Sequence, residues 1–582
     1  MSRTLSFLLA TCLAALPAAA QQSRASFFGL VTDSSGASIP GAKVTITAVD
    51  TNQSTVVETS GDGLFSAPLL TIGNYSIAVE KQGFKRAVRS GLNLQVDQRS
   101  EINFRLDVGG TTETIEVRGE AALVDTGSAT VGKVVENRRV VELPLNGRNA
   151  LALTLLTPSV KSNAGPTNSG FGDRGIQLSS ISINGGPNAM NAQSLDGGNN
   201  IQSYIGEVAI SPAVDAVEEF KVQSGTMSAE FGFTGGGVIN MVTKSGTNDF
   251  HGLVFDLFRN EKLDARSFLA PTRSTIRQNE FGATFGGPVW IPKLYNGKNK
   301  SFFHFVYSGF RFRQGAPNTL QSLIPLDFRQ GDFSRLASPI YDRSTGAPFP
   351  GNRIPTSRFS SVARNILPLI PQPINTGLFN NYLSVGRGAS DSNQYNVKLD
   401  HAFSDRNRIS GFFNRDYLLQ ADPETIAGPT TPGRTVGSQN TLARLSHDLI
   451  LSPTILNHLN VGFTRFRVTI DSFSLNQNWP TQIGLRGIND GANNGFPCVE
   501  FVASGYTRLG DPNCNARVLQ ANNAFQVNES LSVVRGSHNL KFGFDYRFME
   551  TNGIDNFQAP GLFQFNALET GLPNVANSGN AI

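Results

Sequence analysis

The sequence is poor in charged residues and lacks long apolar runs, and both shortages exclude classes of protein. Of the 582 residues 16% are charged, and the 49 Lys and Arg barely outnumber the 45 Asp and Glu. No long basic block occurs, so nucleic-acid binding, which requires clustered Lys and Arg, has little support. Beyond the N-terminal segment no run of about 20 apolar residues is found, which argues against a transmembrane helix.

Patterns of catalytic and metal-binding residues are also missing. Neither a G-x-S-x-G elbow nor a Walker phosphate loop occurs. The G-x-G-x-x-G spelling from Gly170 to Gly175 lacks the preceding strand and following helix that a dinucleotide site requires. The six histidines are scattered without zinc-ligand spacing, at positions 251, 304, 401, 447, 458 and 538. We therefore expect no enzyme activity, no metal site and no cofactor.

The N-terminus has the features of an export signal. Arg3 supplies a positive charge, Leu5 to Leu16 an apolar core, and Ala18 to Ala20 a small-residue cleavage site. Residues 1–20 are therefore predicted to be a signal peptide that is removed on export. A lipoprotein anchor at Cys12 is disfavoured, because the preceding residue is bulkier than usual and the apolar run continues past the cysteine.

Cysteine is rare in the remaining chain. Only Cys498 and Cys514 are left after the signal peptide, and their spacing suits a single disulfide within a loop in an oxidising compartment. No pair of histidines at ligand spacing lies near them, which argues against a metal site.

Glycine and phenylalanine are abundant, with 59 and 41 residues, which suits many strands joined by turns. Residues 24–107 alternate short strand-like runs with Gly- and Asp-rich turns, a pattern typical of an immunoglobulin-like β-sandwich. Runs expected to form strands are Ser26 to Val31, Lys43 to Ala48, Ser54 to Thr59, Tyr75 to Glu80 and Glu101 to Leu106.

The stretch from Gly29 to Phe84 resembles the carboxypeptidase regulatory-like domain. That family is a non-catalytic sandwich related in shape to starch-binding domains. The resemblance implies carbohydrate contact by this unit, or a rigid periplasmic spacer or assembly module.

Residues 108–119 are predicted to be a linker, and residues 120–248 a compact α+β domain. Helices are expected at Asn137 to Leu143 and at Asn149 to Leu156, where Pro158 ends the second helix. Short β-branched runs and crowded glycines follow, up to residue 248.

The stretch from Asp215 to Asp264 is interpreted as a hinge between this compact domain and the first strand of a β-barrel. Its second half, His251 to Arg259, changes to period-two alternation, with Leu253, Phe255 and Leu257 on one face of a strand.

Residues 249–582 repeat the same period-two alternation many times. Short turns such as Phe403 to Arg408 alternate with long links such as Gln314 to about Ser390. Short turns on one side and long loops on the other are typical of an antiparallel transmembrane β-barrel, with an apolar face toward lipid and a charged face toward a wet lumen. In one such strand the side chains expected on the apolar face are Leu540, Phe542, Phe544, Tyr546 and Phe548.

Three ordered motifs resemble the Oar-like branch of the TonB-dependent outer-membrane transporters. They are Leu143-Pro-Leu-Asn-Gly-Arg-Asn149, Leu195-Asp-Gly-Gly-Asn-Asn200 and Gly237-Val-Ile-Asn-Met-Val-Thr-Lys244. The resemblance implies that residues 120–248 are a plug inside the barrel. It also implies import of an external solute, such as an oligosaccharide, a peptide or a chelated metal.

In this family a TonB box lies between the extra domain and the plug. The segment that matches it loosely is Glu113-Thr114-Ile115-Glu116-Val117. An exposed extended segment can be captured as an added strand, so we expect it to contact TonB of the inner-membrane complex. The alternative is that it forms the last strand of the sandwich or a linker. Leu195, Asp196, Gly197, Gly198, Asn199 and Asn200 are expected to be a plug loop that faces solute.

The expected fold is mainly β, with an N-terminal sandwich, an α+β plug and an incomplete barrel. About nine or ten wall strands are counted after residue 249, whereas a barrel with room for such a plug needs about 22. We therefore expect the chain to be a truncated version of a longer protein.

The expected place of the protein is the outer membrane, in contact with lipid. Two alternatives to transport stay open: an adhesion or assembly protein that has kept the barrel, and a carbohydrate-binding protein that acts through the sandwich.

Overall fold

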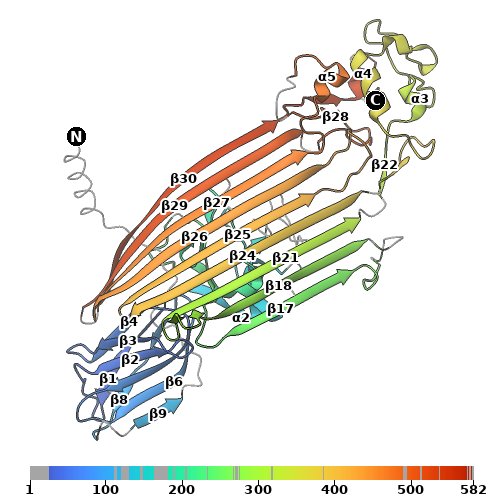
Figure 1. The fold of residues 1–582 in the computed structure, drawn as a ribbon. Coiled ribbons are helices and arrows are strands. Elements are labelled where there is room, and N and C mark those ends of the chain that lie inside the picture. Colours follow the sequence, from blue (N-terminus) through green and yellow to red (C-terminus); the bar gives the residue numbers. More distant parts are fainter. Residues whose placement is uncertain are drawn as a thin grey trace, which may run out of the picture.

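The structure is a computed structural model of the chain. It describes residues 25–110, 114–118, 130–143, 148–162, 181–187, 190–203, 206, 208–232, 234–266, 268, 273, 275–315, 319–384, 386–488, 494–511, 514–535, 538–572, 575, 578 and 579. Most of these residues lie in strands, which confirms the mainly β fold class (Figure 1). Among them, no helix is both long and apolar enough to cross a membrane.

The N-terminal unit is a sandwich of two sheets. One sheet contains β4 (Leu64–Leu70), β1 (Ala25–Asp33), β7 (Arg99–Glu101) and β8 (Phe104–Leu106). The other has the order β3 (Ser54–Glu58), β2 (Lys43–Ala48), β5 (Gly73–Glu80), β6 (Arg86–Leu94) and β9 (Thr114–Arg118). Alternate side chains of the two sheets meet in one apolar core that includes Phe27, Ile46, Tyr75, Ile77 and Leu94.

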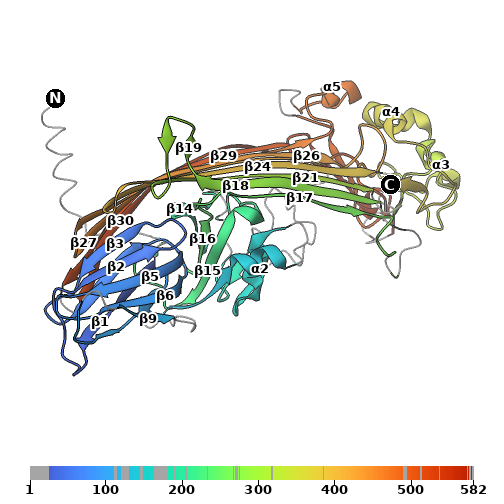
Figure 2. The ribbon, with the colours of Figure 1, turned by 60° about the horizontal axis from the view of Figure 1, so that its bottom comes forward.

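The second unit is a smaller α+β domain beside one face of a large sheet (Figure 2). Its sheet has the order β10 (Val131–Glu136), β15 (Val217–Gly225), β16 (Val238–Thr243), β13 (Ala192–Leu195) and β14 (Gly198–Asn199). The expected first helix is α2 (Asn137–Glu142). The second is a 3₁₀ helix, η1 (Ala150–Leu156), which Asn149 caps by accepting a hydrogen bond from the Leu151 amide. Two short strands, β11 (Val160–Ser162) and β12 (Ile181–Ile183), complete the unit with the 3₁₀ turn η4 (Val214–Ala216).

The large sheet, called the wall below, is antiparallel and consists of nine long strands. Neighbouring strands pair in sequence order, and in the described part of the chain β17 and β30 are the two edges. The strands are β17 (His251–Asn260), β18 (Ile276–Pro288), β21 (Ser301–Gly315), β24 (Arg387–Ser404), β25 (Asn407–Ala421), β26 (Arg434–Ser452), β27 (Ile455–Ser472), β29 (Asn515–Arg535) and β30 (His538–Phe557).

The two ends of the wall differ in their connections. At the end beside the sandwich three connections are tight turns, as between Ser404 and Asn407, and the connection from β18 to β21 carries a small hairpin of β19 (Trp290–Ile291) and β20 (Tyr295–Asn296) (Figure 1). At the far end the links are long and pack around their own apolar core, which includes Phe328, Trp479 and Phe496. Elements of this end, called the loop end below, include α3 (Leu326–Arg329), α4 (Ser361–Ile366), α5 (Trp479–Ile483), β22 (Thr319–Gln321), β23 (Tyr382–Ser384), β28 (Cys498–Phe501) and β31 (Leu562–Phe565).

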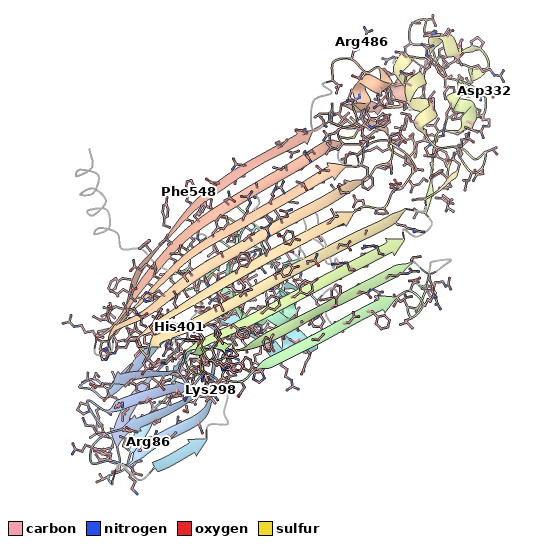
Figure 3. All side chains as sticks on the ribbon, viewed as in Figure 1. Arg86, Lys298, Asp332, His401, Arg486 and Phe548 are labelled. Carbon is pink, nitrogen blue, oxygen red and sulfur yellow. A yellow bond between two sulfur atoms is a disulfide. The ribbon has the colours of Figure 1, made fainter. Side chains whose placement is uncertain are left out.

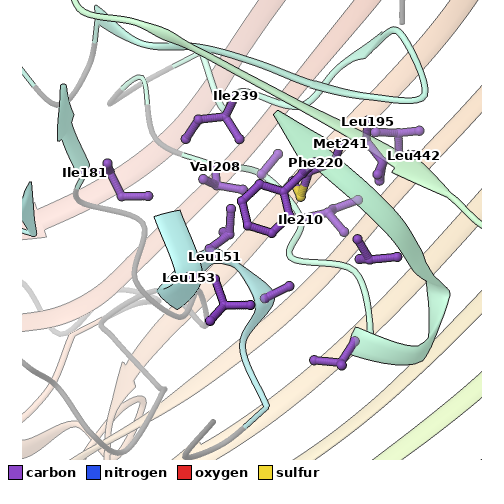
Figure 4. Close-up of a cluster of buried hydrophobic side chains, with 14 of the residues drawn as sticks. Leu151, Leu153, Ile181, Leu195, Val208, Ile210, Phe220, Ile239, Met241 and Leu442 are labelled. Carbon is purple, nitrogen blue, oxygen red and sulfur yellow. The ribbon is translucent and has the colours of Figure 1, made fainter. Parts of the chain in front are cut away.

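Exposure on the wall is the reverse of that in a soluble sheet. The convex face carries exposed apolar side chains: Val461 is 44% exposed, and Tyr546, on the same face as Phe548 (Figure 3), is 59% exposed. The concave face carries buried polar side chains in its middle, where Asn460 is 1% exposed and Asn528 is 0% exposed, and buried apolar side chains such as Phe466 and Val468 nearer the loop end. The α+β unit covers this concave face, and its apolar core continues onto the wall at Leu442 (Figure 4).

Leu253, Phe255 and Leu257 share one face of β17, as predicted, and that face is the concave one. Phe255, which shares its strand face with Leu253 and Leu257, lies under the guanidinium of Arg148 from the α+β unit. These three side chains therefore point to the concave side of β17, and Val254 and Phe258 occupy the convex side, where they are exposed.

Candidate functional site

The turn at Asp196-Gly197 is the place where the α+β unit contacts the wall most closely. Leu195 pairs with Gly198 across a two-residue turn, and both turn residues have positive φ, 50° for Asp196 and 80° for Gly197. Asp-Gly is the sequence that such a tight hairpin turn favours. The motif from Leu195 to Asn200 thus encodes a hairpin that projects from the sheet.

Wall side chains hold the backbone of this hairpin. Asn460 donates a hydrogen bond to the Gly197 carbonyl at 2.9 Å, and Thr464 donates one to the Asn199 carbonyl at 2.6 Å. Gln526 accepts a hydrogen bond from the Asn199 amide at 2.8 Å. All six residues of the hairpin are buried, and Asp196 and Gly197 also line the cavity described below.

Asp196 places a carboxylate among basic groups of the wall. Lys398 Nζ lies 3.2 Å from one oxygen of Asp196, and Arg444 lies 3.7 Å from the other. The Thr243 amide donates to the same carboxylate at 3.1 Å. Burial alone raises the pKa of Asp196, but Lys398, Arg444 and Thr243 outweigh burial and hold that pKa below its usual value.

Arg148 forms a second contact between the α+β unit and the wall. It makes two hydrogen bonds to Asp215, at 2.9 and 3.1 Å. The same guanidinium lies 3.6 Å from Glu280 on β18 and 4.5 Å from the centre of the Phe255 ring on β17. Bidentate pairing with stacking is a geometry that arginine supports and lysine does not.

Further contacts tie the unit to both sides of the wall. Lys541 on β30 forms an ion pair with Glu230. Gln394 on β24 donates to the Ser211 carbonyl at 2.8 Å. The α+β unit is therefore held by strands from β18 to β30.

The sandwich is attached to the α+β unit by a polar cluster, called the clamp below and formed by Val96, Asp97, Glu219, Lys221, Gln223 and Asn240. The Val96 amide donates to Glu219. Asp97 accepts from Gln223 at 3.1 Å and from Asn240 at 2.9 Å through its side chain, and from Lys221 at 3.0 Å through its carbonyl. The sandwich also contacts the wall, since Arg408 donates to the Ser54 carbonyl at 2.8 Å.

The acids of the clamp are strongly perturbed. Burial, assisted by the Glu218, Asp97 and Glu136 carboxylates, raises the pKa of Glu219 to about 8 against the lowering effect of the Val96 amide. Burial likewise raises the pKa of Asp97 to about 6, although Lys221 and Asn240 act in the opposite direction. Because both pKa values are raised, the contact between the sandwich and the α+β unit is more stable when Glu219 and Asp97 are protonated.

The segment expected to contact TonB lies at the edge of the sandwich. Thr114–Arg118 forms β9 and runs parallel to β6, with Ile115 opposite Ala87. Glu113 lies outside the described residues. The alternative stated above, that this segment is the last strand of the sandwich, is the arrangement in the structure. β9 ends the strand order of its sheet.

Cys498 and Cys514 form a disulfide with their Cα atoms 5.5 Å apart. Both belong to the loop end. In the described ranges no group of three or more His, Cys, Asp or Glu side chains could hold a metal ion.

A polar cavity of about 210 Å³ lies where the sandwich, the α+β unit and the wall meet. Its lining includes Asp196 and Glu218 of the α+β unit, Asn74 of the sandwich, and Asp400 and His458 of the wall. All three parts of the chain therefore contribute side chains to this cavity.

Sequence reasoning missed the basic partners of the hairpin and the whole clamp. Lys398 and Arg444 could have been recognised as inward-facing residues from the sequence. Each is a cation with an apolar residue on either side in its strand, so it points away from the apolar face. The clamp has no such signal in the sequence.

Comparison with known proteins places the two ends of the chain. The model of the outer membrane beta barrel domain matches residues 242–582, and that of the carboxypeptidase regulatory-like domain matches residues 26–107. The TonB-dependent transporter Oar of Myxococcus xanthus is 30% identical over 275 residues, which are 44% of this chain and 24% of the relative. The chain thus aligns with about a quarter of the length of that relative.

Two solved structures that resemble most of the chain at low identity are outer-membrane proteins. The outer membrane transporter YddB from Escherichia coli has a TM-score of 0.47 at 11% identity, covering 75% of this chain and 50% of its own. A variant of the ferric enterobactin receptor PfeA from Pseudomonas aeruginosa has a TM-score of 0.39 at 12% identity, covering 72% and 49%.

The relative from Myxococcus xanthus is a transporter by its name. The barrel match includes every wall strand and well over half of the sequence. The chain belongs to the outer-membrane β-barrel family, and it carries a carboxypeptidase regulatory-like domain at its N-terminal side.

Proposed function

We propose that the protein is a TonB-dependent outer-membrane transporter that imports a large external solute. The observation that carries the proposal is the α+β unit held as a plug against the polar concave face of the wall. Asp196, Arg148 and Glu230 each bond across this contact. The apolar core of the plug also continues onto the wall around Leu442 and Phe466, so movement of the plug must break these polar bonds and part that apolar contact.

The proposed location is the outer membrane, reached after removal of the signal peptide of residues 1–20. Exposed apolar side chains on the convex face, such as Val461 and Phe548, supply the surface for lipid contact. The short turns and the sandwich then lie on the periplasmic side and the loop end lies outside the cell.

Energy for transport is proposed to arrive as a pulling force on β9. A strand at the end of a sheet has main-chain groups that a partner strand can engage, which makes Glu113 to Val117 the proposed contact for TonB. Because β9 pairs with β6 of the sandwich and the clamp joins the sandwich to the plug, the force reaches the plug through the sandwich.

The hairpin from Leu195 to Asn200 is proposed to be a latch between plug and wall. Its burial and its bonds to Asn460, Thr464 and Gln526 support this role over direct contact with solute. The solute class is left open among oligosaccharides, peptides and chelated metals.

Carbohydrate binding through the sandwich is less well supported. Stacking against a sugar requires an exposed aromatic ring, and none of the aromatic side chains within residues 25–110 is exposed. Four of them, Phe27, Phe65, Tyr75 and Phe104, belong to the buried core.

The test is to disable β9 without altering the rest of the chain. Deletion of residues 113–117 and the substitution Ile115→Pro, which removes an amide from the strand, are compared with Ile115→Val as the matched control. We expect the isolated periplasmic domain of TonB to bind the wild type and Ile115→Val but neither disabled form. Surface display, measured with an antibody to the loop end, should be equal for all four.

Equal TonB binding by the deletion variant contradicts the proposed contact. Normal display of a wild-type protein that binds no TonB, and that takes up no labelled oligosaccharide, peptide or ferric chelate, supports the adhesion alternative.

A further inference from the structure

The sandwich touches three other parts of the chain: the plug, the wall and the link that joins them. Figure 2 shows it beside the plug, at the end of the wall where the short turns lie. The link runs from the end of β16 to the start of β17, and within it the Asn248 amide donates a hydrogen bond to the Asp50 carbonyl of the sandwich at 2.9 Å. A plug that moves away from the wall must therefore either take the sandwich with it or separate from it.

The contact between the sandwich and the plug is shielded from water. The four residues that the plug contributes to the clamp are each at most 7% exposed. Asp97 bonds to three of them, and at the edge of the clamp Gln95 donates to Glu136 at 2.8 Å. Hydrogen bonds are stronger in such an environment, because its dielectric constant is low. This contact therefore resists separation.

The contact between the sandwich and the wall is more open. Arg408 on β25 donates to the Ser54 carbonyl at 2.8 Å and to the Thr55 hydroxyl at 3.2 Å, and both Arg408 and Ser54 are only half-buried. The polar cavity of about 210 Å³ lies along the same contact, between Asn74 of the sandwich and Asp448 of the wall.

This cavity is large and polar enough to admit water. Water that reaches a hydrogen bond can replace either partner, so the net free energy lost when the bond opens is small. The contact between the sandwich and the wall is thus the weaker of the two contacts that the sandwich makes.

We infer that the sandwich and the plug leave the wall as one body when force is applied at β9. The contact of Arg408 with Ser54 and Thr55 is then a lock that must open first, and the clamp stays closed. The inference rests on the proposed function only in taking β9 as the point of pull. It gives the sandwich a role beyond that of a spacer, because the sandwich holds the plug in place until force arrives.

The test applies force to the purified protein in a supported lipid bilayer. A biotin acceptor peptide inserted after Arg118, where β9 ends, provides the handle for an optical trap. The variant S54C/R408C allows a short bismaleimide to join the sandwich to the wall, and Q95C/E136C allows it to join the sandwich to the plug. Each double variant is measured before and after reaction with the bismaleimide, so that it serves as its own control.

We expect the first rupture to be a single step that is too short for the unfolding of either domain. The crosslink in S54C/R408C should abolish this step at the force that ruptures the wild type, whereas the crosslink in Q95C/E136C should leave it unchanged. Arg408→Ala should rupture about tenfold faster at constant force, because it loses hydrogen bonds from a charged donor. Arg406→Ala, in the neighbouring exposed turn, should rupture like the wild type.

Loss of the step on crosslinking Q95C/E136C but not S54C/R408C overturns the inference, because the sandwich then stays on the wall while the plug leaves. An equal effect of both crosslinks, no effect of either, or a first step with the length of an unfolded domain also overturns it.

The proposed function is tested separately with the isolated periplasmic domain of TonB in place of the biotin handle. A TonB domain that forms no tether to the wild type contradicts the proposed contact at β9. The measurements with the biotin handle still decide whether the sandwich and the plug move together.

Discussion

Strand β5 of the sandwich and strand β27 of the wall alternate apolar and polar residues in the same way, but they present opposite faces to the outside. In β5 the apolar Tyr75, Ile77 and Val79 are buried. In β27 the polar Asn460 and Thr464 are buried, and the apolar Val461 is exposed. Alternation therefore shows that a strand has two different faces, and the partner packed on one face decides which of them is outside.

The partner of the wall explains the reversal. The plug presents polar backbone at its hairpin and charged side chains such as Asp196 and Arg148, so the concave face of the wall needs donors and acceptors. The sandwich has only another apolar sheet face to cover. In each region the buried face is the one whose side chains find suitable partners on the neighbouring element, either hydrogen-bonding groups or apolar side chains.

The largest effect on the contact between plug and wall is expected from removing the buried carboxylate of the hairpin. Asp196→Ala takes away the charge that faces Lys398 and Arg444, and breaking a buried ion pair costs about 3–5 kcal/mol. We expect the plug to detach at lower urea concentration, measured by proteolysis of residues 192–200. Asp62→Ala, in an exposed turn of the sandwich, is the control. Equal urea midpoints for both variants contradict the latch.

Truncating one apolar side chain in the sandwich and one in the wall compares the free-energy cost of losing a buried and an exposed apolar group. Ile77→Ala should lower the free energy of unfolding of the sandwich by about 2–5 kcal/mol, because it leaves a cavity in a close-packed core. Val461→Ala on the exposed face of the wall should cost less than about 1 kcal/mol. Hydrogen exchange of peptides from β5 and β27 measures both. A cost at Val461 as large as that at Ile77 would place Val461 in a dry core.

A charge on the convex face tests which solvent that face meets. Val461→Arg should reduce the free energy of folding into vesicles by about 2–4 kcal/mol, the usual cost of arginine near the middle of the membrane. Thr435→Arg, on the same face nearer the loop end and opposite Asp471, should cost no more than about 1 kcal/mol. If Val461→Arg folds into vesicles as readily as Thr435→Arg, the convex face does not meet the membrane interior.

The smallest effect concerns the clamp that joins the two regions. Glu219 and Asp97 have pKa values of about 8 and about 6 in the docked state, above the ordinary values of free carboxyl groups. Docking is therefore strongest below about pH 4, where both acids are protonated in either state, and it weakens as the pH rises toward about 8. Each bound proton contributes about 1.4 kcal/mol per pH unit in this range.

Site-directed crosslinking between the sandwich and the plug measures this dependence on pH. Glu219→Gln should flatten it above pH 6, and Glu58→Gln, at an exposed position of β3, should leave it unchanged. A crosslinking yield that rises with pH in the wild type contradicts the assigned direction of the pKa shifts.

Much of the architecture follows from the sequence, because its signals are local. The Asp196-Gly197 turn and the alternation in β27 and β30 depend only on neighbouring residues. Two sandwich strands were not predicted. In β4, Pro68 reads as a strand breaker, but it lies at an irregularity in the pairing with β1. In β6, Gly91 has a φ of 76° and interrupts the pattern in the same way.

The contacts of the candidate site could not be predicted, because they join residues far apart in the sequence. Lys398 lies 202 residues from Asp196, and Asp97 lies 143 residues from Asn240. No local pattern states which inward-facing cation meets which carboxylate. The sequence did not say whether Phe255 points inward or outward, since both faces of β17 are apolar and the cation that covers one of them comes from the plug.

The most direct test of the account is the environment of each position along β27 in the protein reconstituted into lipid. Spin labels are attached singly at positions 459 to 464, and their accessibility to oxygen, which concentrates in lipid, is compared with that to a water-soluble nickel complex. We expect high accessibility to oxygen at positions 459, 461 and 463. At positions 460, 462 and 464, where the plug covers the wall, we expect low accessibility to both reagents. High accessibility to nickel at the odd positions, or no alternation at all, would contradict the account.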